Sequence, residues 1–284
     1  MKHPIVDSLQ GVTLVGGGPV SAIALAKARA LAPRIVGADS GADRLLRLGV
    51  TPEAVIGDMD SLSASARVRL ADRLFPIAEQ DTTDFDKALR LIDAPLVLAL
   101  GFAGARLDHG LAAFTTLIAR AERRCILIGP QDLAFAAPSR LELALLPGEP
   151  LSLFPMAQVT GRSEGLEWPI AGISFAPDGM IGTSNRVTAP EVEVEMDAPS
   201  MLAILPRNRL DAVLALIRDT VAGDPRPLPK PAPQVVAGAL GDLAVQVIIA
   251  PGAKSPAGQV TLAILSSLTV IGPLMVTLPE LVTS

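Results

Sequence analysis

Four short polar clusters in the first half of the chain carry the side chains best suited to chemistry. They lie at residues 39–43, 57–61, 80–84 and 106–109. Their carboxylates include Asp39, Asp58, Asp60, Asp84 and Asp108. Each cluster directly follows a short apolar segment. A carboxylate in that position can reach a ligand while the backbone that precedes it stays in the core.

The apolar segments alternate with segments of helical spacing, which indicates a parallel sheet. Strands are predicted at residues 12–15, 35–38, 54–56, 95–100 and 125–128, with a weaker strand at 76–78. Helices are predicted at residues 21–30, 42–48, 65–74, 84–92 and 111–120. Such alternation predicts a Rossmann-like α/β fold with helices on both faces of the sheet. Because open parallel sheets bind ligands outside the carboxyl ends of their strands, the polar clusters should converge there.

Convergence of several carboxylates points to a metal ion. Carboxylates this close repel and raise one another's pKa unless a cation joins them. The chain has a single cysteine, Cys125, and two histidines, His3 and His109, so a Cys/His zinc cluster is excluded. Oxygen ligands favour Mg²⁺, Mn²⁺ or Ca²⁺, and Mg²⁺ is usually shared with substrate phosphates. The pattern therefore favours metal-assisted phosphate chemistry.

Each polar residue also has a structural interpretation. Asp84 and Asp108 precede or begin helical segments and could be helix N-caps. Arg106 could be an ordinary surface arginine, and Trp168 could be a core anchor. The turn at residues 16–19 matches neither the dinucleotide-binding nor the P-loop pattern. Recurrence of polar clusters at four strand ends is what favours the functional interpretation.

The second half of the chain has a different texture. After about residue 138, helical spacing gives way to closely spaced turns, and glutamates alternate with apolar residues at 191–196. This predicts a small antiparallel β-sandwich, closed by a helix at 209–218. The predicted division is an α/β domain at residues 1–138, a β domain at 139–218, and a proline-rich linker with an apolar extension of unknown role at 219–284.

Composition excludes several classes of protein. Half of the residues are apolar and 19% are charged, as in globular proteins. The net charge of −5 argues against nonspecific nucleic-acid binding. The first residues lack the pattern of a signal peptide, so a cytoplasmic location is expected. The uncharged stretch between Lys254 and Glu280 contains prolines and glycines, which argues against a membrane span.

The polar motifs resemble those of the thiamine pyrophosphokinase family. They are Asp-Ser-Gly-Ala at residues 39–42, Gly-Asp-Met-Asp-Ser at 57–61, Gln-Asp-Thr-Thr-Asp-Phe-Asp-Lys at 80–87 and Gly-Phe-Ala-Gly-Ala-Arg-Leu-Asp-His at 101–109. Met59 stands where the family usually has phenylalanine. Residues 165–169 and 182–185 look like the family's thiamine-side segments. The resemblance spans about residues 10–207 and leaves residues 220–284 outside it.

The resemblance implies an Mg²⁺-dependent enzyme that transfers the pyrophosphoryl group of ATP to the hydroxyl of thiamine, giving thiamine diphosphate and AMP. It implies that the α/β domain binds ATP and Mg²⁺, that the β domain binds thiamine, and that the active site forms between the subunits of a homodimer. The implied metal ligands are Asp58, Asp60 and Asp84, and with Asp108 these are the implied catalytic residues. The implied ATP-binding residues are Asp39, Gln80, Thr83, Lys87 and Arg106. The implied thiamine-binding residues are Trp168, Ser184 and Asn185.

Two other functions fit parts of the pattern. A related pyrophosphokinase acting on a hydroxymethyl pterin would share the α/β motifs, whereas Trp168 and residues 182–185 favour thiamine. A nucleotide-binding module without turnover would have little reason to keep so many mutually repelling carboxylates.

Overall fold

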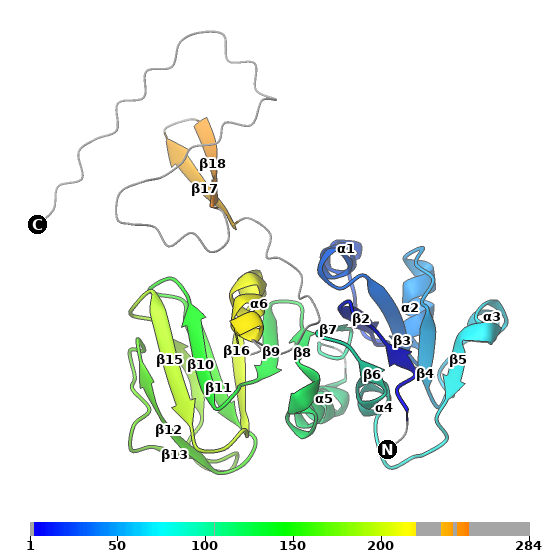
Figure 1. Ribbon diagram of the computed structural model, residues 1–284, viewed down its shortest axis with the longest axis horizontal. Helices are drawn as coiled ribbons and strands as arrows, with labels where there is room; N and C mark the ends of the chain where they lie inside the picture. The colour runs from blue at the N-terminus through cyan, green and yellow to red at the C-terminus, as the bar shows by residue number, and fades with distance from the viewer. Residues whose placement is uncertain (1–2, 105, 220–233, 241–242, 250–284) are drawn as a thin grey trace, which may run out of the picture. The chain divides into compact units, whose positions relative to one another are not determined.

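The computed structural model describes residues 3–104, 106–219, 234–240 and 243–249. The chain divides into two compact units, Met1–Pro231 and Ala232–Ser284, which are described separately here. The first unit is built around a ten-stranded sheet (Figure 1). Its strand order is β14-β11-β16-β9-β8-β7-β2-β3-β4-β5.

Six neighbouring strands of this sheet are parallel, as the sequence predicts. They are β2 (Val12–Val15), β3 (Arg34–Ala38), β4 (Ala54–Gly57), β5 (Leu74–Pro76), β7 (Val97–Leu100) and β8 (Cys125–Ile128). The chain runs outward from β2 to β5 and then returns to the other side of β2 as β7. The strand order therefore reverses between β2 and β7, which is where open α/β sheets bind ligands.

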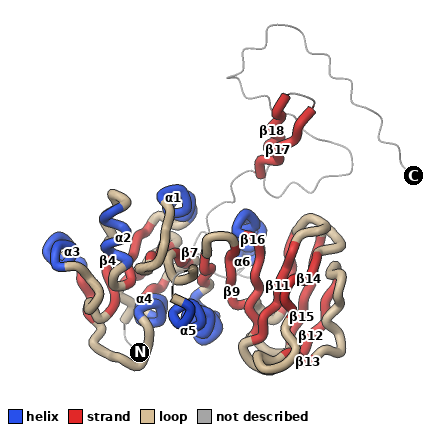
Figure 2. Tube along the Cα trace, turned by 180° about the vertical axis from the view of Figure 1, so that it is seen from behind, coloured by secondary structure: helices blue, strands red, loops and turns tan. Residues whose placement is uncertain are grey.

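Helices cover both faces of the parallel strands, which confirms the predicted layers. Because strand side chains alternate between faces, Val15 packs with the helices on one side and Leu14 with those on the other. The first face carries α1 (Ala22–Leu31), α2 (Gly41–Arg47) and α3 (Ala64–Arg69). The second carries α4 (Asp84–Arg90) and α5 (Leu107–Ala119) (Figures 1 and 2).

Side-chain caps fix where three of these helices begin. Ser21 accepts a hydrogen bond from the amide of Ala24 at the start of α1, and Ser63 and Thr83 do the same for α3 and α4. Three short 3₁₀ turns accompany the helices: Ala71–Arg73, Ala121–Arg123 and Arg207–Arg209. The helix predicted at 84–92 ends at Arg90, because the next residues form β6 (Ile92–Asp93), which pairs with β1 (Val6–Asp7).

Antiparallel strands extend the same sheet beyond β8 and build the predicted β-sandwich. The extension consists of β9 (Asp132–Ala136), β16 (Met201–Pro206), β11 (Pro150–Pro155) and β14 (Gly182–Arg186). A second sheet contains β10 (Arg140–Ala144), β15 (Glu191–Met196), β12 (Val159–Glu164) and β13 (Ser174–Phe175). Val192 and Val194 of β15 share one core with Leu151 and Leu153 of β11, so the two sheets pack face to face.

The predicted boundary at residue 138 falls between β9 and β10, and the ten-stranded sheet continues across it. The division into domains stays a prediction. The last helix of the first unit, α6 (Leu210–Asp219), packs on β10. In the second unit the structure describes one antiparallel hairpin, β17 (Gln234–Leu240) and β18 (Leu243–Ile249). The remainder of the predicted linker and extension lies outside the described residues. Within the described part of the chain, no helix combines the length and apolar character needed to cross a membrane.

Candidate active site

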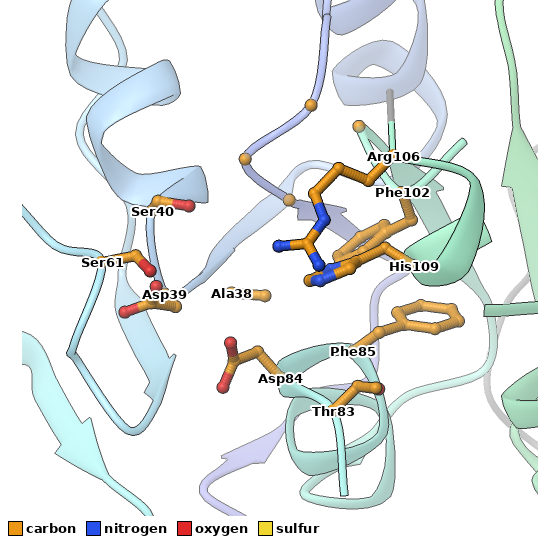
Figure 3. Close-up of a pocket in the computed structure, with 14 residues that line it drawn as sticks. Ala38, Asp39, Ser40, Ser61, Thr83, Asp84, Phe85, Phe102, Arg106 and His109 are labelled. Carbon is orange, nitrogen blue, oxygen red and sulfur yellow. The ribbon is translucent and has the colours of Figure 1, made fainter. Parts of the chain in front are cut away.

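A pocket of about 300 Å³ opens at the point where the strand order reverses (Figure 3). Its lining comes from the turns after β2, β3, β4 and β7 and from the first turns of α4 and α5. The lining residues are Gly16, Gly17, Gly18, Ala38, Asp39, Ser40, Ser61, Thr83, Asp84, Phe85, Gly101, Phe102, Arg106 and His109. All four polar clusters of the sequence therefore contribute to one cavity.

Two glycine-containing turns form one wall of this pocket. The amide of Gly18 donates to the carbonyl of Gly101 at 2.9 Å. A Cβ at Gly18 would lie 2.6 Å from that carbonyl oxygen, so no side chain fits between the turns. Gly101 itself has φ +77°, a left-handed conformation that glycine adopts without strain. Glycine at these positions leaves backbone, rather than side chains, facing the cavity.

The carboxylates of Asp58 and Asp60 gather around Asp39 at one end of the pocket; Asp58 and Asp60 are not among the residues that line it. Oxygen atoms of Asp39, Asp58 and Asp60 all lie within 4.8 Å of one another. Asp39 is 3% exposed, and its Oδ1 atom is buried without a hydrogen-bond partner. Burial raises the pKa of Asp39, and the nearby carboxylates raise it further, although the backbone amide of Ser40 opposes this. One oxygen of this buried carboxylate is therefore left without a protein donor.

Lys87 lies beneath these acids with 1% of its side chain exposed. Its Nζ atom donates to Oδ2 of Asp58 at 2.7 Å and to Oδ1 of Asp84 at 3.2 Å. Burial alone would lower the pKa of Lys87, but the bonds to the two carboxylates outweigh it and the pKa is raised. The hydrogen bond from Lys87 is also the main cause that lowers the pKa of Asp58. Lys87 therefore ties α4 to the loop after β4.

Asp84 faces the same cavity as Asp39 (Figure 3). A Cβ at Gly57 would lie 3.0 Å both from the Cβ of Asp39 and from Oδ1 of Asp84, so the two acids flank the end of β4. The carboxylate oxygens within 4.8 Å of one another nevertheless belong to Asp39, Asp58 and Asp60, whereas Asp84 lies beside them and is paired with Lys87.

These residues fit a hard divalent cation. The donor set consists of carboxylate oxygens, the kind of ligand that Mg²⁺ prefers. The unpartnered, buried Oδ1 of Asp39 would gain a partner, and the repulsion that raises the pKa of Asp39 would be relieved. Lys87 neutralises only part of the negative charge, because it donates to Asp58 and Asp84 while Asp39 and Asp60 add two further carboxylates.

A basic and partly apolar wall faces the acids across the cavity (Figure 3). Arg106 is 70% exposed and pairs with Asp108 at 2.6 Å, whereas Asp108 itself does not line the pocket. His109 does line it, although sequence reasoning did not assign it a role. Phe102 packs against Phe85 with ring centroids 4.3 Å apart.

Only some of the residues predicted to bind ATP line the pocket. Thr83 lines the pocket and caps α4 through a hydrogen bond from the amide of Asp86. Gln80 is exposed and does not line the pocket, and Lys87 lies beneath the acids rather than in the lining. The roles assigned to Gln80, Thr83, Lys87 and Arg106 stay predictions.

Trp168, Ser184 and Asn185 form a second polar cluster on the β-sandwich. Asn185 clamps the backbone of Trp168, accepting from its amide at 3.2 Å and donating to its carbonyl at 2.7 Å. The indole is 53% exposed, and the guanidinium of Arg186 lies 5.9 Å from its ring centroid. Ser184 has φ +60°, and its amide donates to Ser152. The clamp presents an exposed aromatic surface in a fixed position.

The two clusters lie far apart within one chain. Asn185 lies on β14, the edge strand of the ten-stranded sheet, while Asp39 follows β3. Seven strand steps separate β14 from β3 in the sheet order. At roughly 4.8 Å a step, the separation is on the order of 30 Å.

Comparisons with known proteins agree on one family. A family model described as thiamin pyrophosphokinase, catalytic domain, matches residues 26–128. Another, described as thiamin pyrophosphokinase, vitamin B1 binding domain, matches residues 140–201. Thiamine pyrophosphokinase 2 of Oryza sativa subsp. japonica is 28% identical over an alignment of 177 residues, covering 55% of this chain and 66% of that protein. The chain thus matches just under two thirds of that relative's length.

Solved structures show the same fold. The crystal structure of thiamin pyrophosphokinase from Geobacillus thermodenitrificans superposes with a TM-score of 0.57 at 22% identity, covering 69% of this chain and 96% of that one. Thiamin pyrophosphokinase from Candida albicans gives a TM-score of 0.58 at 16% identity, covering 70% and 90%. With both family models matching in order, the chain belongs to the thiamin pyrophosphokinase family.

Proposed function

We propose that this protein is an Mg²⁺-dependent thiamine pyrophosphokinase, which transfers the pyrophosphoryl group of ATP to the hydroxyl of thiamine and releases AMP. The observation that carries the proposal is the group of Asp39, Asp58 and Asp60 within 4.8 Å at the end of a glycine-walled pocket. The family membership supports the choice of substrates. The reaction would take place in the cytoplasm.

Asp39, Asp58 and Asp60 would hold the metal ion, with Asp84 beside them. When bound, Mg²⁺ supplies charge neutralisation for the ATP phosphates and the departing AMP. Lys87 keeps Asp58 ionised, because it donates to the Asp58 carboxylate at 2.7 Å and lowers the pKa of that group. Asp58 is thereby ready to act as a ligand at neutral pH.

Arg106 would bind phosphate oxygens from the opposite wall. Its guanidinium is directed into the pocket (Figure 3) and forms an exposed pair with Asp108. Solvent-exposed ion pairs are weak, so a phosphate can replace Asp108 as the partner of Arg106. The transfer itself requires mainly alignment and charge stabilisation from the protein. Asp108 would then lose its pairing with Arg106, although it does not itself line the pocket.

Trp168 would bind the thiazolium ring of thiamine on its exposed indole surface. An aromatic surface attracts a cation by about 0.5–2 kcal/mol. Ser184 and Asn185 belong to the same cluster, and Asn185 fixes the backbone that carries the indole. Because this cluster is on the order of 30 Å from the acids of its own chain, we propose a homodimer in which each site combines the acids of one subunit with Trp168 of the other.

The acceptor can be tested directly. The protein is incubated with ATP, Mg²⁺ and either thiamine or a hydroxymethyl pterin, and the products are separated by chromatography. AMP and thiamine diphosphate are expected when thiamine is the acceptor, and no diphosphorylated product is expected with the pterin. Diphosphorylated pterin, with no product from thiamine, would contradict the proposed substrate. Tight ATP binding without AMP release from either acceptor would favour a binding module.

A further inference from the structure

The loop that follows β4 places two of the clustered acids, and its backbone is unusual. The acidic loop (residues 58–63) carries Asp58 and Asp60 on either side of Met59. Met59 has φ +68°, in the left-handed region that residues other than glycine seldom occupy. Such a conformation persists only where surrounding contacts determine it. The contacts that hold Met59 therefore also determine where Asp58 and Asp60 point.

Arg67 of α3 supplies the most direct of these contacts. Its Nε atom donates to the carbonyl of Leu62 at 3.2 Å, and its Nη2 atom donates to the carbonyl of Met59. One planar guanidinium thus binds two carbonyls of the acidic loop at once. A guanidinium presents its donors in a rigid fork, so it fixes the distance between the two carbonyls that it binds.

Apolar contacts anchor the same two residues from their side chains. Met59 and Leu62 are buried in a cluster with Ala66 and Leu70 of the α3 region. Asp58 and Asp60 lie between and beside these buried side chains, within 4.8 Å of Asp39. Arg67 lies on the same helix as Ala66, so α3 holds the acidic loop through both its backbone and its side chains.

Asp43 of α2 closes the far end of the acidic loop. Its carboxylate accepts hydrogen bonds from the amide of Ser63, at 3.0 Å, and from the Ser63 hydroxyl. Ser63 in turn caps α3. Asp43 belongs to the first polar cluster of the sequence, yet it does not line the pocket. Asp43 instead forms its hydrogen bonds with Ser63, the last residue of the acidic loop.

We propose that Arg67 is a positioning residue for the divalent-cation site: through the carbonyl of Met59 it holds Asp58 and Asp60 in the arrangement that binds the ion. This rests on the proposed function, which requires the ion. Arg67 does not line the pocket and touches the acidic loop only through its backbone. Its loss should therefore weaken cation binding without altering the surfaces that contact ATP or thiamine.

The test compares Arg67→Met with Arg69→Met, a matched control on the same helix whose side chain is exposed. Binding of Mn²⁺ alone is measured by electron paramagnetic resonance on the full-length protein. Arg67→Met should weaken binding by about 10-fold or more, the scale seen when a supporting contact of a metal ligand is lost. Arg69→Met should bind as the wild type does. Arg67→Lys, which keeps one donor to a carbonyl, should fall between them.

Activity gives a second readout. The Mg²⁺ concentration for half-maximal rate should rise in Arg67→Met, while the KM for thiamine at saturating Mg²⁺ stays unchanged. Equal Mn²⁺ binding in Arg67→Met and Arg69→Met would overturn the proposal for Arg67. If Arg67→Met does not fold, equal binding by Arg67→Lys and wild type would overturn it. Failure of the wild type to bind Mn²⁺ would instead contradict the proposed function, so the two failures are distinguishable.

Discussion

The Nζ atom of Lys87 lies 2.7 Å from Oδ2 of Asp58, and this lysine is almost completely buried. The pair joins the first turns of α4 to the loop after β4, two segments that are distant in sequence. A buried ammonium is costly unless it is paired, so Lys87 depends on its acids as much as they depend on it. The contact explains how acids from different loops are held together before any ligand binds.

Lys87→Met should destabilise the protein in a pH-dependent way. Removing the ammonium leaves Asp58 unpaired, and the free energy of unfolding should fall on the order of 2 kcal/mol at neutral pH. Because the folded-state pKa of Asp58 lies below 3.8, its share of the stabilisation is present above that pH and is lost as pH falls through the folded pKa. Because the pKa of Lys87 lies above 10.5, its share is lost as pH rises through that higher value.

The measurement is urea unfolding of wild type and Lys87→Met in metal-free buffer between pH 3 and 11. The gap in unfolding free energy should be widest at neutral pH and should narrow at both extremes. If the difference in unfolding free energy between wild type and Lys87→Met stays constant across this range, the ion pair makes no pH-dependent contribution to stability. Lys27→Met, a change to an exposed lysine on α1, is the control.

Asp84→Ala should reduce turnover by about 10² or more, the scale of losing one group that stabilises charge in the transition state. Asp84 lines the pocket, whereas Asp81 is exposed in the same segment and does not line it. Asp81→Ala is therefore the matched control and should keep nearly full activity. Steady-state AMP release with thiamine at saturation measures both. Wild-type turnover in Asp84→Ala would remove Asp84 from the mechanism.

Trp168→Ala should raise the KM for thiamine and leave the KM for ATP unchanged. The indole is more than half exposed and its backbone is clamped by Asn185, so its loss should not disturb the pocket at the other cluster. A loss of about 0.5–2 kcal/mol of cation–π attraction corresponds to a rise in KM of roughly 2- to 30-fold. Trp168→Phe keeps an aromatic ring and should therefore raise the KM for thiamine less than Trp168→Ala does. An unchanged KM for thiamine would show that the ring binds elsewhere.

The shared site of the proposed homodimer can be tested by complementation. Differently tagged Asp84→Ala and Trp168→Ala chains are co-expressed, and the mixed dimers are purified through both tags. If each site takes its acids from one subunit and Trp168 from the other, a mixed dimer contains one intact site and should show about half of the wild-type turnover at a thiamine concentration far below the KM of Trp168→Ala. Mixed dimers with no more than about half of the turnover of the Trp168→Ala parent would mean that each site is built from a single chain.

Regular parts of the fold followed closely from the sequence. Strands at residues 12–15 and 125–128 agree with the structure to the residue, because both are buried on both faces and read as continuous apolar segments. The helix predicted at 65–74 is broken at Leu70 into α3 and a 3₁₀ turn. Two-residue strands such as Ile92–Asp93 form only through pairing with a distant segment, so local periodicity could not reveal them.

The sequence indicated which strand ends carry the site, but not how its side chains are oriented. The placement of Asp39 among the clustered oxygens depends on left-handed backbone at Asp39 itself, and that of Asp58 and Asp60 on Met59. Left-handed backbone is uncommon in residues other than glycine; an aspartate such as Asp39 signals it only weakly, and a methionine such as Met59 does not signal it. The sequence also did not distinguish His109 from a surface histidine, whereas in the structure His109 lies on α5 and lines the pocket.

The central claim is that the acids of this pocket act through a divalent ion on the phosphates of ATP. Its most direct test is the rate of AMP and thiamine diphosphate formation in Mg²⁺, in EDTA, and in EDTA followed by restored Mg²⁺. The account predicts product only when Mg²⁺ is present, with full recovery on restoration. Equal rates in EDTA and in Mg²⁺ would contradict it.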